Sequence, residues 1–112
     1  MSSDNYQGYA NYPTWAMALW IDNEQPSQER ALELAKQARE QAPDLPQVGD
    51  GIWTTTEAER FTLADELKDW VEDEMIPDLD NGPAADLLQH ALGQIDWHEL
   101  ADHYLQDLDE QD

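Results

Sequence analysis

The chain has 112 residues, of which 40% are hydrophobic, and its 26 acidic residues outnumber its five basic residues, giving a formal net charge of −21. Five tryptophans favour a folded chain over a disordered one, and the absence of cysteine excludes disulfides and thiolate chemistry. This charge argues against direct binding to nucleic acid or to an anionic membrane, so the natural partner is a basic protein.

The length predicts a single domain over residues 1–112, with frayed ends at 1–10 and 109–112. The first residues lack a basic leader, and the longest apolar run, Trp15 to Ile21, is too short to cross a bilayer. We therefore expect a soluble, cytoplasmic protein.

The first predicted helix covers Thr14 to Asn23, with Pro13 near its first turn, where a missing N–H costs little. Its apolar side chains surround the helix instead of forming one stripe. A helix that is apolar on every side is usually buried. We therefore expect Trp15, Leu19 and Trp20 to form the centre of the fold.

The second predicted helix runs from Ser27, as its N-cap, to Gln41, with small residues on one face and balanced charges. Residues 42–54 contain two prolines, two glycines and two aspartates, which predict a long loop. Within it, Val48, Ile52 and Trp53 could form a short extended piece, and Trp53 is expected to pack onto the core.

The third predicted helix is capped by Thr55 or Thr56, because Glu59 follows Thr56 at capping-box spacing, and it ends at Pro77. One face is apolar and the opposite face is acidic. The apolar positions are Phe61, Ala64, Leu67, Trp70, Val71 and Met75. The acidic positions are Asp65, Glu66, Asp69, Glu72 and Asp73.

Two further helices complete the predicted fold, the first after the turn at Asn81-Gly82-Pro83. Its apolar stripe, expected to be buried, is Ala84, Leu87, Leu88, Ala91, Leu92 and Ile95. Asp96, with Glu99 three residues later, predicts the cap of the last helix. That helix would bury Trp97, Leu100, Ala101, Tyr104, Leu105 and Leu108 and expose Glu99, Asp102, His103, Gln106 and Glu110. The predicted fold class is all-α, a compact bundle of four to five short helices with one long loop around residues 42–54.

Two segments resemble metal sites but depart from the required spacing. His98 and His103 stand at i and i+5, whereas a zinc-protease helix needs i and i+4, and the pairs His98 with Asp102 or Glu99 with His103 supply only two ligands. In segment 78–89 the glycine of a calcium loop comes one place early and a glutamine replaces its final glutamate. The many carboxylates lie on solvated faces, so we expect no metal, no cofactor and no enzymatic activity.

The acidic residues are concentrated in the second half of the chain. Residues 1–60 hold ten acidic and four basic residues, whereas residues 61–112 hold sixteen acidic residues against Lys68 alone. On the third helix the carboxylates would extend over about 12 Å at intervals of about 6 Å, close to the spacing of phosphates along a nucleic-acid strand. Solubility needs a smaller net charge. Adaptation to a high-salt cytoplasm would spread the charge evenly, and it stays open as an alternative.

The segment NYPTWAMALWIDN, residues 11–23, is similar to an N-Y-x-T-W-x-x-x-L-W-I-x-N pattern near the start of small, mostly uncharacterised proteins of phages, plasmids and other mobile elements. Ala16 stands where such proteins often have asparagine. The resemblance implies a mobile-element context, in which small acidic proteins that imitate DNA block host defence. It implies no catalytic residue.

These observations lead to two hypotheses. In the first, the protein is a DNA mimic, an anti-CRISPR or anti-restriction inhibitor that covers the basic DNA-binding surface of a host defence nuclease. The expected partner-binding residues are Asp65, Glu66, Asp69, Glu72, Asp73, Glu99 and Asp102, with Asp78, Asp80 and Asp86 between the two groups. In the second, it is a non-catalytic adaptor or structural module of a mobile element, which binds through apolar surface of the first helix at Met17 or Trp20. The target and the oligomeric state do not follow from the sequence.

Overall fold

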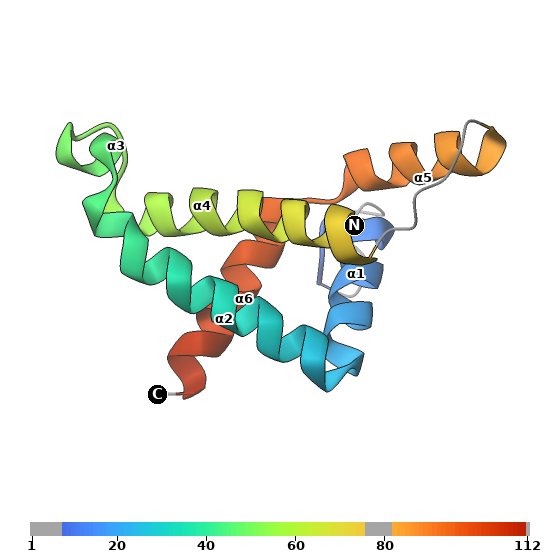
Figure 1. Cartoon of the computed structure of the whole chain (residues 1–112), viewed down its shortest axis with the longest axis horizontal. Coiled ribbons are helices and arrows are strands. Elements are labelled where there is room, and N and C mark those ends of the chain that lie inside the picture. The colour runs from blue at the N-terminus through green and yellow to red at the C-terminus, as the bar shows by residue number, and fades with distance from the viewer. Residues whose placement is uncertain (1–7, 76–81, 112) are drawn as a thin grey trace.

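A computed structural model of the protein describes residues 8–75 and 82–111 (Figure 1). These residues form an all-α fold, as the sequence predicts, and contain no strand. The helices are α1 (Tyr12–Asn23), α2 (Gln25–Gln41), α3 (Pro46–Gly49), α4 (Thr55–Trp70), α5 (Pro83–Gln94) and α6 (Trp97–Gln111). A 3₁₀ turn, Ala42–Asp44, follows α2, and a π-helical segment, Val71–Met75, extends α4. The five long helices correspond to the five predicted ones.

The core lies where α2, α4 and α6 pack against one another (Figure 1). On α2, the side chains of Ala31, Ala35 and Ala38 are fully buried. Because these side chains are short, the other two helices approach α2 closely. On α4, Leu67 is fully buried as predicted, and Leu63, which was not part of the predicted apolar stripe, is fully buried as well.

Helix α6 supplies the largest fully buried side chain, that of Tyr104. The predicted cap of this helix is confirmed, because Asp96 Oδ1 accepts a hydrogen bond of 3.0 Å from the Glu99 amide. The Tyr104 hydroxyl donates to Asp22 Oδ1 on α1 at 3.1 Å. Burial, reinforced by the negative charge of Asp22, raises the pKa of Tyr104 far above its ordinary value. Tyr104 therefore occupies the position that the sequence suggested for the α1 tryptophans.

The prediction that Trp15, Leu19 and Trp20 form the centre of the fold is wrong, because the first is only half-buried and the other two are exposed. Trp20 is 63% exposed and Leu19 is 40% exposed, whereas Ala18 and Ile21 are buried. Helix α1 packs against α2, α5 and α6 along one side only, and it lies at the edge of the fold (Figure 1). The buried side of α1 is therefore formed by Thr14, Ala18 and Ile21, whereas Tyr12, Leu19 and Trp20 face outward.

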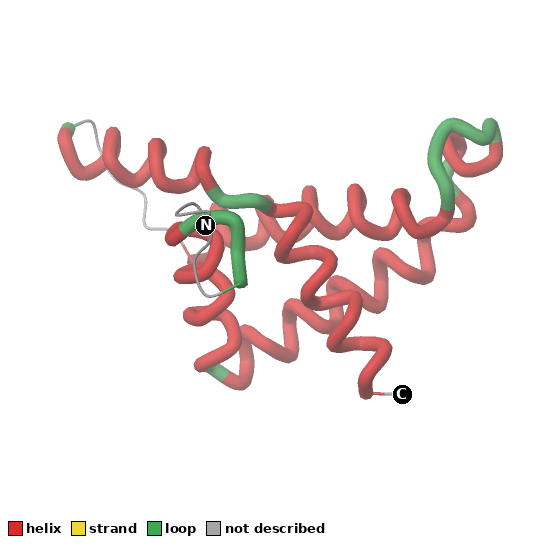
Figure 2. Tube along the Cα trace, turned by 180° about the vertical axis from the view of Figure 1, so that it is seen from behind, coloured by secondary structure: helices red, strands yellow, loops and turns green. Residues whose placement is uncertain are grey.

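The predicted apolar stripe of α5 is buried only in part: Ala84 and Leu87 are exposed, and Leu88, Ala91 and Leu92 are half-buried. No side chain within α5 is buried, and Leu87 is 71% exposed. Leu92 packs against the core from one side, and Ile95, just after the helix, is buried. Figures 1 and 2 show α5 extending away from the three-helix core as an arm. The C-terminal end of this arm lies next to the start of α1, where Asn11 Nδ2 donates to the Gln94 carbonyl.

Two helix starts differ from the predicted caps. Helix α4 is capped by Thr54, whereas the predicted cap was Thr55 or Thr56. Thr54 and Glu57 form a capping box: Thr54 Oγ1 accepts from the Glu57 amide at 3.1 Å, and Glu57 Oε1 accepts from the Thr54 amide at 3.0 Å. Helix α2 begins at Gln25, so Ser27 lies inside the first turn and does not cap it. Pro26 does not interrupt the helix, because proline is compatible with a first helical turn.

The predicted loop 42–54 is partly helical. The one-turn helix α3 and the preceding 3₁₀ turn occupy much of it, so the expected extended piece does not form. Trp53 lies against the ring of Phe61 with centroids 4.9 Å apart, but both residues are only half-buried and neither belongs to the core cluster, and Ile52 is exposed. Within the described part of the chain, no helix is both long and apolar enough to span a membrane.

Candidate partner-binding surface

Helix α4 separates its apolar residues from its acidic ones. Its buried residues face α2 and α6, which turns the opposite side of the helix to solvent. Four acidic residues on that side, all exposed, form what we call the α4 acidic face: Asp65, Asp69, Glu72 and Asp73. From the first to the last of them the helix rises by about 12 Å.

The basic residues near the core pair with acidic residues outside this face. Arg30 Nη1 lies 2.9 Å from Glu33 Oε1, and Arg60 Nη1 lies 3.9 Å from Asp102 Oδ2. Among residues 8–75 and 82–111, no ion pair joins a basic side chain to the α4 acidic face. This face therefore forms no ion pair within the described structure, although the exposed Lys68 lies on the same helix, three residues after Asp65 and four before Glu72.

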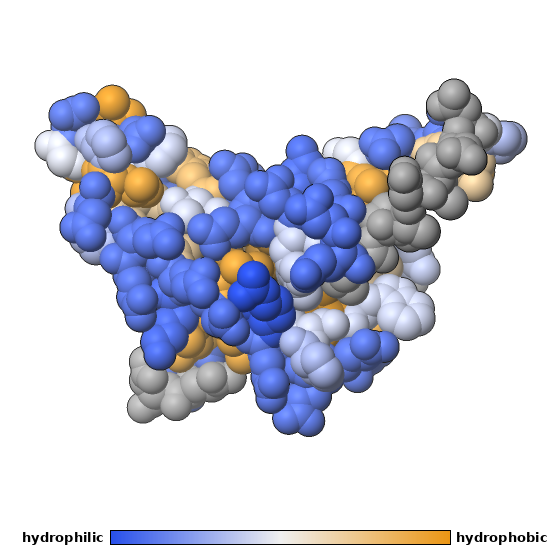
Figure 3. Space-filling model, in the orientation of Figure 1, coloured by the Kyte–Doolittle hydropathy of each residue, from blue (hydrophilic) through white to orange (hydrophobic). Residues whose placement is uncertain are grey.

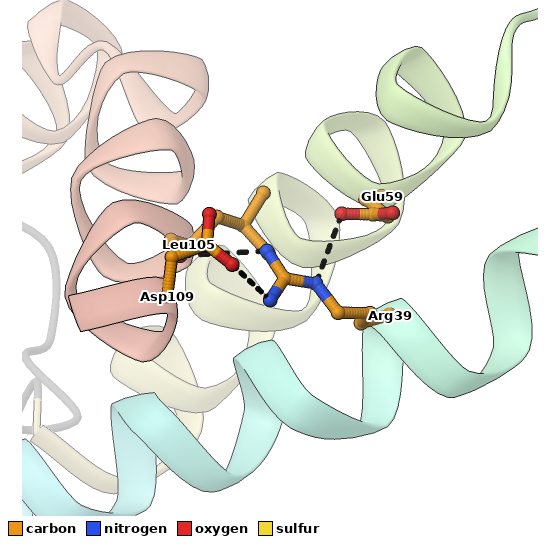
Figure 4. Close-up of polar contacts among 4 residues, drawn as sticks. All are labelled: Arg39, Glu59, Leu105 and Asp109. Atoms are coloured by element: carbon orange, nitrogen blue, oxygen red, sulfur yellow. Dashed lines mark hydrogen bonds and ion pairs between the residues drawn. The ribbon is translucent and has the colours of Figure 1, made fainter. Parts of the chain in front are cut away.

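Arg39 of α2 forms hydrogen bonds with residues of α4 and α6 (Figure 4). From α2, its Nε donates to Glu59 of α4 at 3.3 Å, and its Nη1 donates to Asp109 of α6 at 2.6 Å. Its Nη2 also donates to the carbonyl of Leu105 at 3.4 Å. Burial alone would lower the pKa of Arg39, but the hydrogen bonds to Asp109 and Glu59 outweigh it and raise the pKa above its ordinary value. Arg39 thus connects all three core helices.

Glu66 lies next to the α4 acidic face but in a different environment. It is half-buried and lines an open hollow of about 320 Å³ between α2 and α4, together with Arg30, Leu34 and Trp70. Its Oε2 atom is shielded from solvent and has no hydrogen-bond partner among the described residues. Burial, with a contribution from Asp69, raises the pKa of Glu66, and Arg30 opposes this shift.

The surface around this hollow is largely hydrophilic. Figure 3 shows hydrophilic residues covering most of α2 and α4 on this side, with a small apolar area between the two helices. The apolar lining residues are Leu34 and Trp70, and Asp69 and Asp73 of the α4 acidic face lie beside them. The hollow therefore combines apolar walls with an acidic edge.

Glu99 and Asp102 lie elsewhere, where α6 meets the N-terminal segment (Figure 2). Glu99 Oε1 accepts a hydrogen bond of 2.9 Å from the Ala10 amide, and Asp102 is the ion-pair partner of Arg60. Tyr9 packs against the core from the same segment. Residues 9 and 10, which were expected to be frayed, are therefore held by α6, and α6 itself continues to Gln111.

The structure thus divides the seven predicted partner-binding residues into two groups. The five on α4 share one side of the protein, although Glu66 is half-buried. Glu99 and Asp102 already have partners within the fold. Of the residues expected between the groups, Asp86 is exposed on α5, and those at positions 78 and 80 lie outside the described residues.

The two histidines of α6 have different neighbours. His98 lies edge-on against Phe61 with ring centroids 5.2 Å apart. His103 Nε2 lies 3.3 Å from Asp22 Oδ2 and 3.5 Å from Asp107 Oδ2. In the described parts of the chain, no three side chains of the metal-binding types converge on one point. Segment 78–89, the other metal candidate, lies partly outside the described residues.

Two polar residues of the N-terminal motif have a structural role. Asn11 caps α1, because its Oδ1 accepts from the Thr14 amide at 3.0 Å and from Thr14 Oγ1 at 2.7 Å. Asn11 Nδ2 donates to the Gln94 carbonyl at 2.7 Å, and Thr14 Oγ1 accepts from the Asp96 amide at 2.9 Å. The motif therefore fixes the start of α1 to the junction between α5 and α6.

The sequence did not identify three residues that line the α2–α4 hollow. Trp70 was assigned to the core, Arg30 to a helix of balanced charge, and Glu74 was left out of the acidic face. One pattern could have indicated Trp70 and Glu74. Together with Glu66 they recur every four residues, so the three side chains lie on one side of a helix. An aromatic residue between two acidic ones at this spacing indicates a half-buried edge.

The comparisons with known proteins give a family but no activity. A model of DUF7249, a family of unknown function, matches residues 2–108, so the chain belongs to this family. No curated protein and no solved structure matches the chain. Any inference about function therefore depends on the surface itself.

Proposed function

We propose that this protein is a non-catalytic DNA mimic that inhibits a nuclease complex of host defence, of the restriction or CRISPR type, by occupying its basic DNA-binding surface. The supporting observation is the α4 acidic face, whose four exposed carboxylates have no paired cation among the described residues. The partner is then a basic, nucleic-acid-binding protein in the host cytoplasm. No reaction is involved, because the inhibitor acts by covering a surface.

The energetics of α4 support a role outside the fold. Asp65 and Asp69 are four residues apart, and so are Asp69 and Asp73, which places like charges next to each other on the helix. Each such pair destabilises a helix by a few tenths of a kcal/mol. A basic partner would remove this repulsion, and electrostatic attraction would accelerate its association.

The geometry of the face is also compatible with a nucleic-acid-binding channel. Neighbouring carboxylates on a helix side are about 6 Å apart, close to the distance between successive phosphates of one strand. The resemblance of residues 11–23 to a motif of mobile-element proteins supports the same assignment, because such elements gain from blocking host nucleases.

The proposal can be tested by DNA cleavage. The purified protein is added to purified restriction and CRISPR nuclease complexes, and cleavage of labelled DNA is followed at salt concentrations from about 50 to 500 mM. We expect inhibition of at least one complex, relief of inhibition by excess DNA, and weaker inhibition as salt rises. Inhibition that is independent of salt, or that excess DNA does not relieve, would contradict the proposal.

A second candidate function is favoured by the exposure of α1. Trp20 and Leu19 are large apolar residues on the surface of a very acidic protein, and such a surface commonly binds another protein. In this case the chain is an adaptor of a mobile element, and the acidity is incidental. Trp20→Ala separates the two candidates: loss of the partner with an intact fold supports the adaptor, and unchanged nuclease inhibition supports the DNA mimic.

A further inference from the structure

The hollow beside Glu66 is one part of a longer groove between α2 and α4. A second hollow, of about 420 Å³, lies between the start of α2 and the end of α4. The two hollows share three lining residues: Arg30, Trp70 and Glu74. We call the combined feature the α2–α4 groove, and Trp70 stands at its middle.

The groove has the chemical groups that bind an arginine side chain. The half-buried indole of Trp70 offers an aromatic face to a planar cation, and Leu34 offers apolar contact to its methylene stem. Glu66, Asp73 and Glu74 supply carboxylates next to the indole. A guanidinium can stack on an aromatic ring while it donates two parallel hydrogen bonds to a carboxylate, whereas an ammonium cannot do both in a fixed geometry.

Two features show that the groove can accept a further cation. Arg30, its resident cation, is engaged with Glu33 at 2.9 Å on the surface of α2. Glu66 Oε2, in contrast, is shielded from water and accepts no hydrogen bond among the described residues. A buried carboxylate oxygen without a donor is costly, and a guanidinium in the groove would supply the donor once the half-buried carboxylate turns toward it.

We propose that the α2–α4 groove takes an arginine side chain of the basic partner, with the guanidinium between the indole of Trp70 and the carboxylate of Glu66. This inference rests on the proposed function, because that function supplies the basic partner. The groove then fixes the position of the partner, and the α4 acidic face provides long-range attraction.

The test is an NMR titration of the full-length protein with two blocked peptides, Gly-Arg-Gly and Gly-Lys-Gly, at physiological salt. The Trp70 indole N–H signal is assigned by its loss in Trp70→Phe. We expect the arginine peptide to shift this signal and to bind about fivefold more tightly than the lysine peptide. Equal affinities, or shifts spread over the acidic surface without one at Trp70, would overturn the proposal.

Variants separate the groove from general charge. Glu66→Gln should weaken binding of the arginine peptide about fivefold and leave the thermal midpoint unchanged or higher. Glu40→Gln makes the same charge change at an exposed position of α2 outside the groove and should leave affinity within about twofold. Arg30→Gln should strengthen binding, because it removes the resident cation. If Glu66→Gln and Glu40→Gln have equal effects, the groove is not the site.

The outcomes also distinguish this inference from the proposed function. Nuclease inhibition that Glu66→Gln does not change, together with equal arginine and lysine affinities, overturns the groove and leaves the DNA mimic standing. Arginine-selective binding at Trp70 without inhibition of any nuclease overturns the DNA mimic and leaves the groove as an arginine-binding site.

Discussion

The exposed sides of α4 and α1 differ in their physical chemistry, although both helices pack against α2. The α4 side carries four exposed carboxylates without ion pairs in the described structure, and the α1 side carries Leu19 and Trp20. One surface depends on long-range attraction that salt weakens, and the other depends on contact with apolar surface that salt strengthens or leaves unchanged. Salt dependence therefore tells which of the two surfaces a partner uses.

The comparison also shows where the fold places its polar contacts. On α1, Asn11, Thr14 and Asp22 all bond to the α5–α6 junction or to α6, so these polar residues hold the helix, and Leu19 and Trp20 remain outside. On α4 the arrangement is reversed: the apolar residues lie inside, and the α4 acidic face, which forms no ion pair in the described structure, lies outside. Neither exposed side is explained by the stability of the fold.

The largest expected effect comes from neutralising the α4 acidic face. The quadruple variant should weaken binding to an inhibited nuclease about a thousandfold at low salt, because all four charges act on the same basic surface. Its substitutions are Asp65→Asn, Asp69→Asn, Glu72→Gln and Asp73→Asn. The measurement is the inhibition constant in the cleavage assay, with circular dichroism as the test of folding.

A matched control for this variant exists in the same chain. Glu29, Glu40, Asp44 and Asp50 are exposed and have no ion pair in the described structure. Their neutralisation changes the net charge by the same amount and should weaken binding much less. Equal losses of nuclease affinity in the two variants would mean that only net charge matters. Full nuclease inhibition by the variant of the α4 acidic face would show that this face does not bind the nuclease.

The next effect compares the two sides of α1. Ile21→Ala removes a fully buried side chain and should lower the free energy of unfolding by about 3 kcal/mol. Trp20→Ala, at the neighbouring exposed position, should change it by less than about 0.5 kcal/mol. Urea denaturation measures both. A large loss for Trp20→Ala would show that the indole supports the fold, and the adaptor hypothesis would lose its basis.

Thr14→Val should cost about 2 kcal/mol, because it leaves the Asp96 amide without its acceptor and Asn11 Oδ1 without one of its donors. Thr55→Val, at an exposed position in the first turn of α4, is the control and should have little effect. Equal stability of the two variants in urea would show that the motif does not hold the α5–α6 junction.

Tyr104→Phe should cost about 1.5 kcal/mol at neutral pH, since the hydroxyl donates to the Asp22 carboxylate. The pKa of Tyr104 is raised in the folded protein, so the unfolded chain loses this proton first as pH rises. The wild-type protein therefore loses stability above the ordinary tyrosine pKa of about 10. The variant should lose less in that range, and a parallel pH profile would contradict the assignment.

The smallest expected effect concerns Glu66. Its pKa is raised in the folded protein, so the folded state holds this proton longer and stability falls as pH rises from the ordinary glutamate pKa through the raised one. Glu66→Gln should remove this part of the pH dependence. Thermal midpoints, measured as a function of pH upward from the ordinary glutamate pKa, test this expectation. An unchanged profile would show that Glu66 is solvated like its neighbours.

The sequence predicted the all-α class, the five long helices and the acidic side of α4, because each depends on local periodicity. It did not predict that Trp20 would be exposed. Helix α1 is apolar all round, so its pattern contains no information about which side packs. The choice is made by the partners of Thr14 and Asp22, which are Asp96 at the α5–α6 junction and Tyr104 of α6.

The arm formed by α5 illustrates the same limit. Its apolar stripe is regular, but burial also requires a neighbouring surface, and the residue of α5 that packs against the core is Leu92, near its C-terminal end, with the buried Ile95 just after the helix. The division of the acidic residues was equally hidden. Glu99 and Asp102 look like any surface carboxylate in the sequence, and only the fold brings Ala10 and Arg60 to them.

The π-helical end of α4 has a further consequence for the mechanics of binding. Glu72, Asp73 and Glu74 lie in the last turns of the helix, where the helix macrodipole is already negative. Dipole and side chains repel each other there, and the wider π-turn forms weaker intrahelical contacts. This end should open first in hydrogen exchange, and a bound cation would offset the negative charge that gathers there. Partner binding would then stiffen the helix end, and slower amide exchange there would report it.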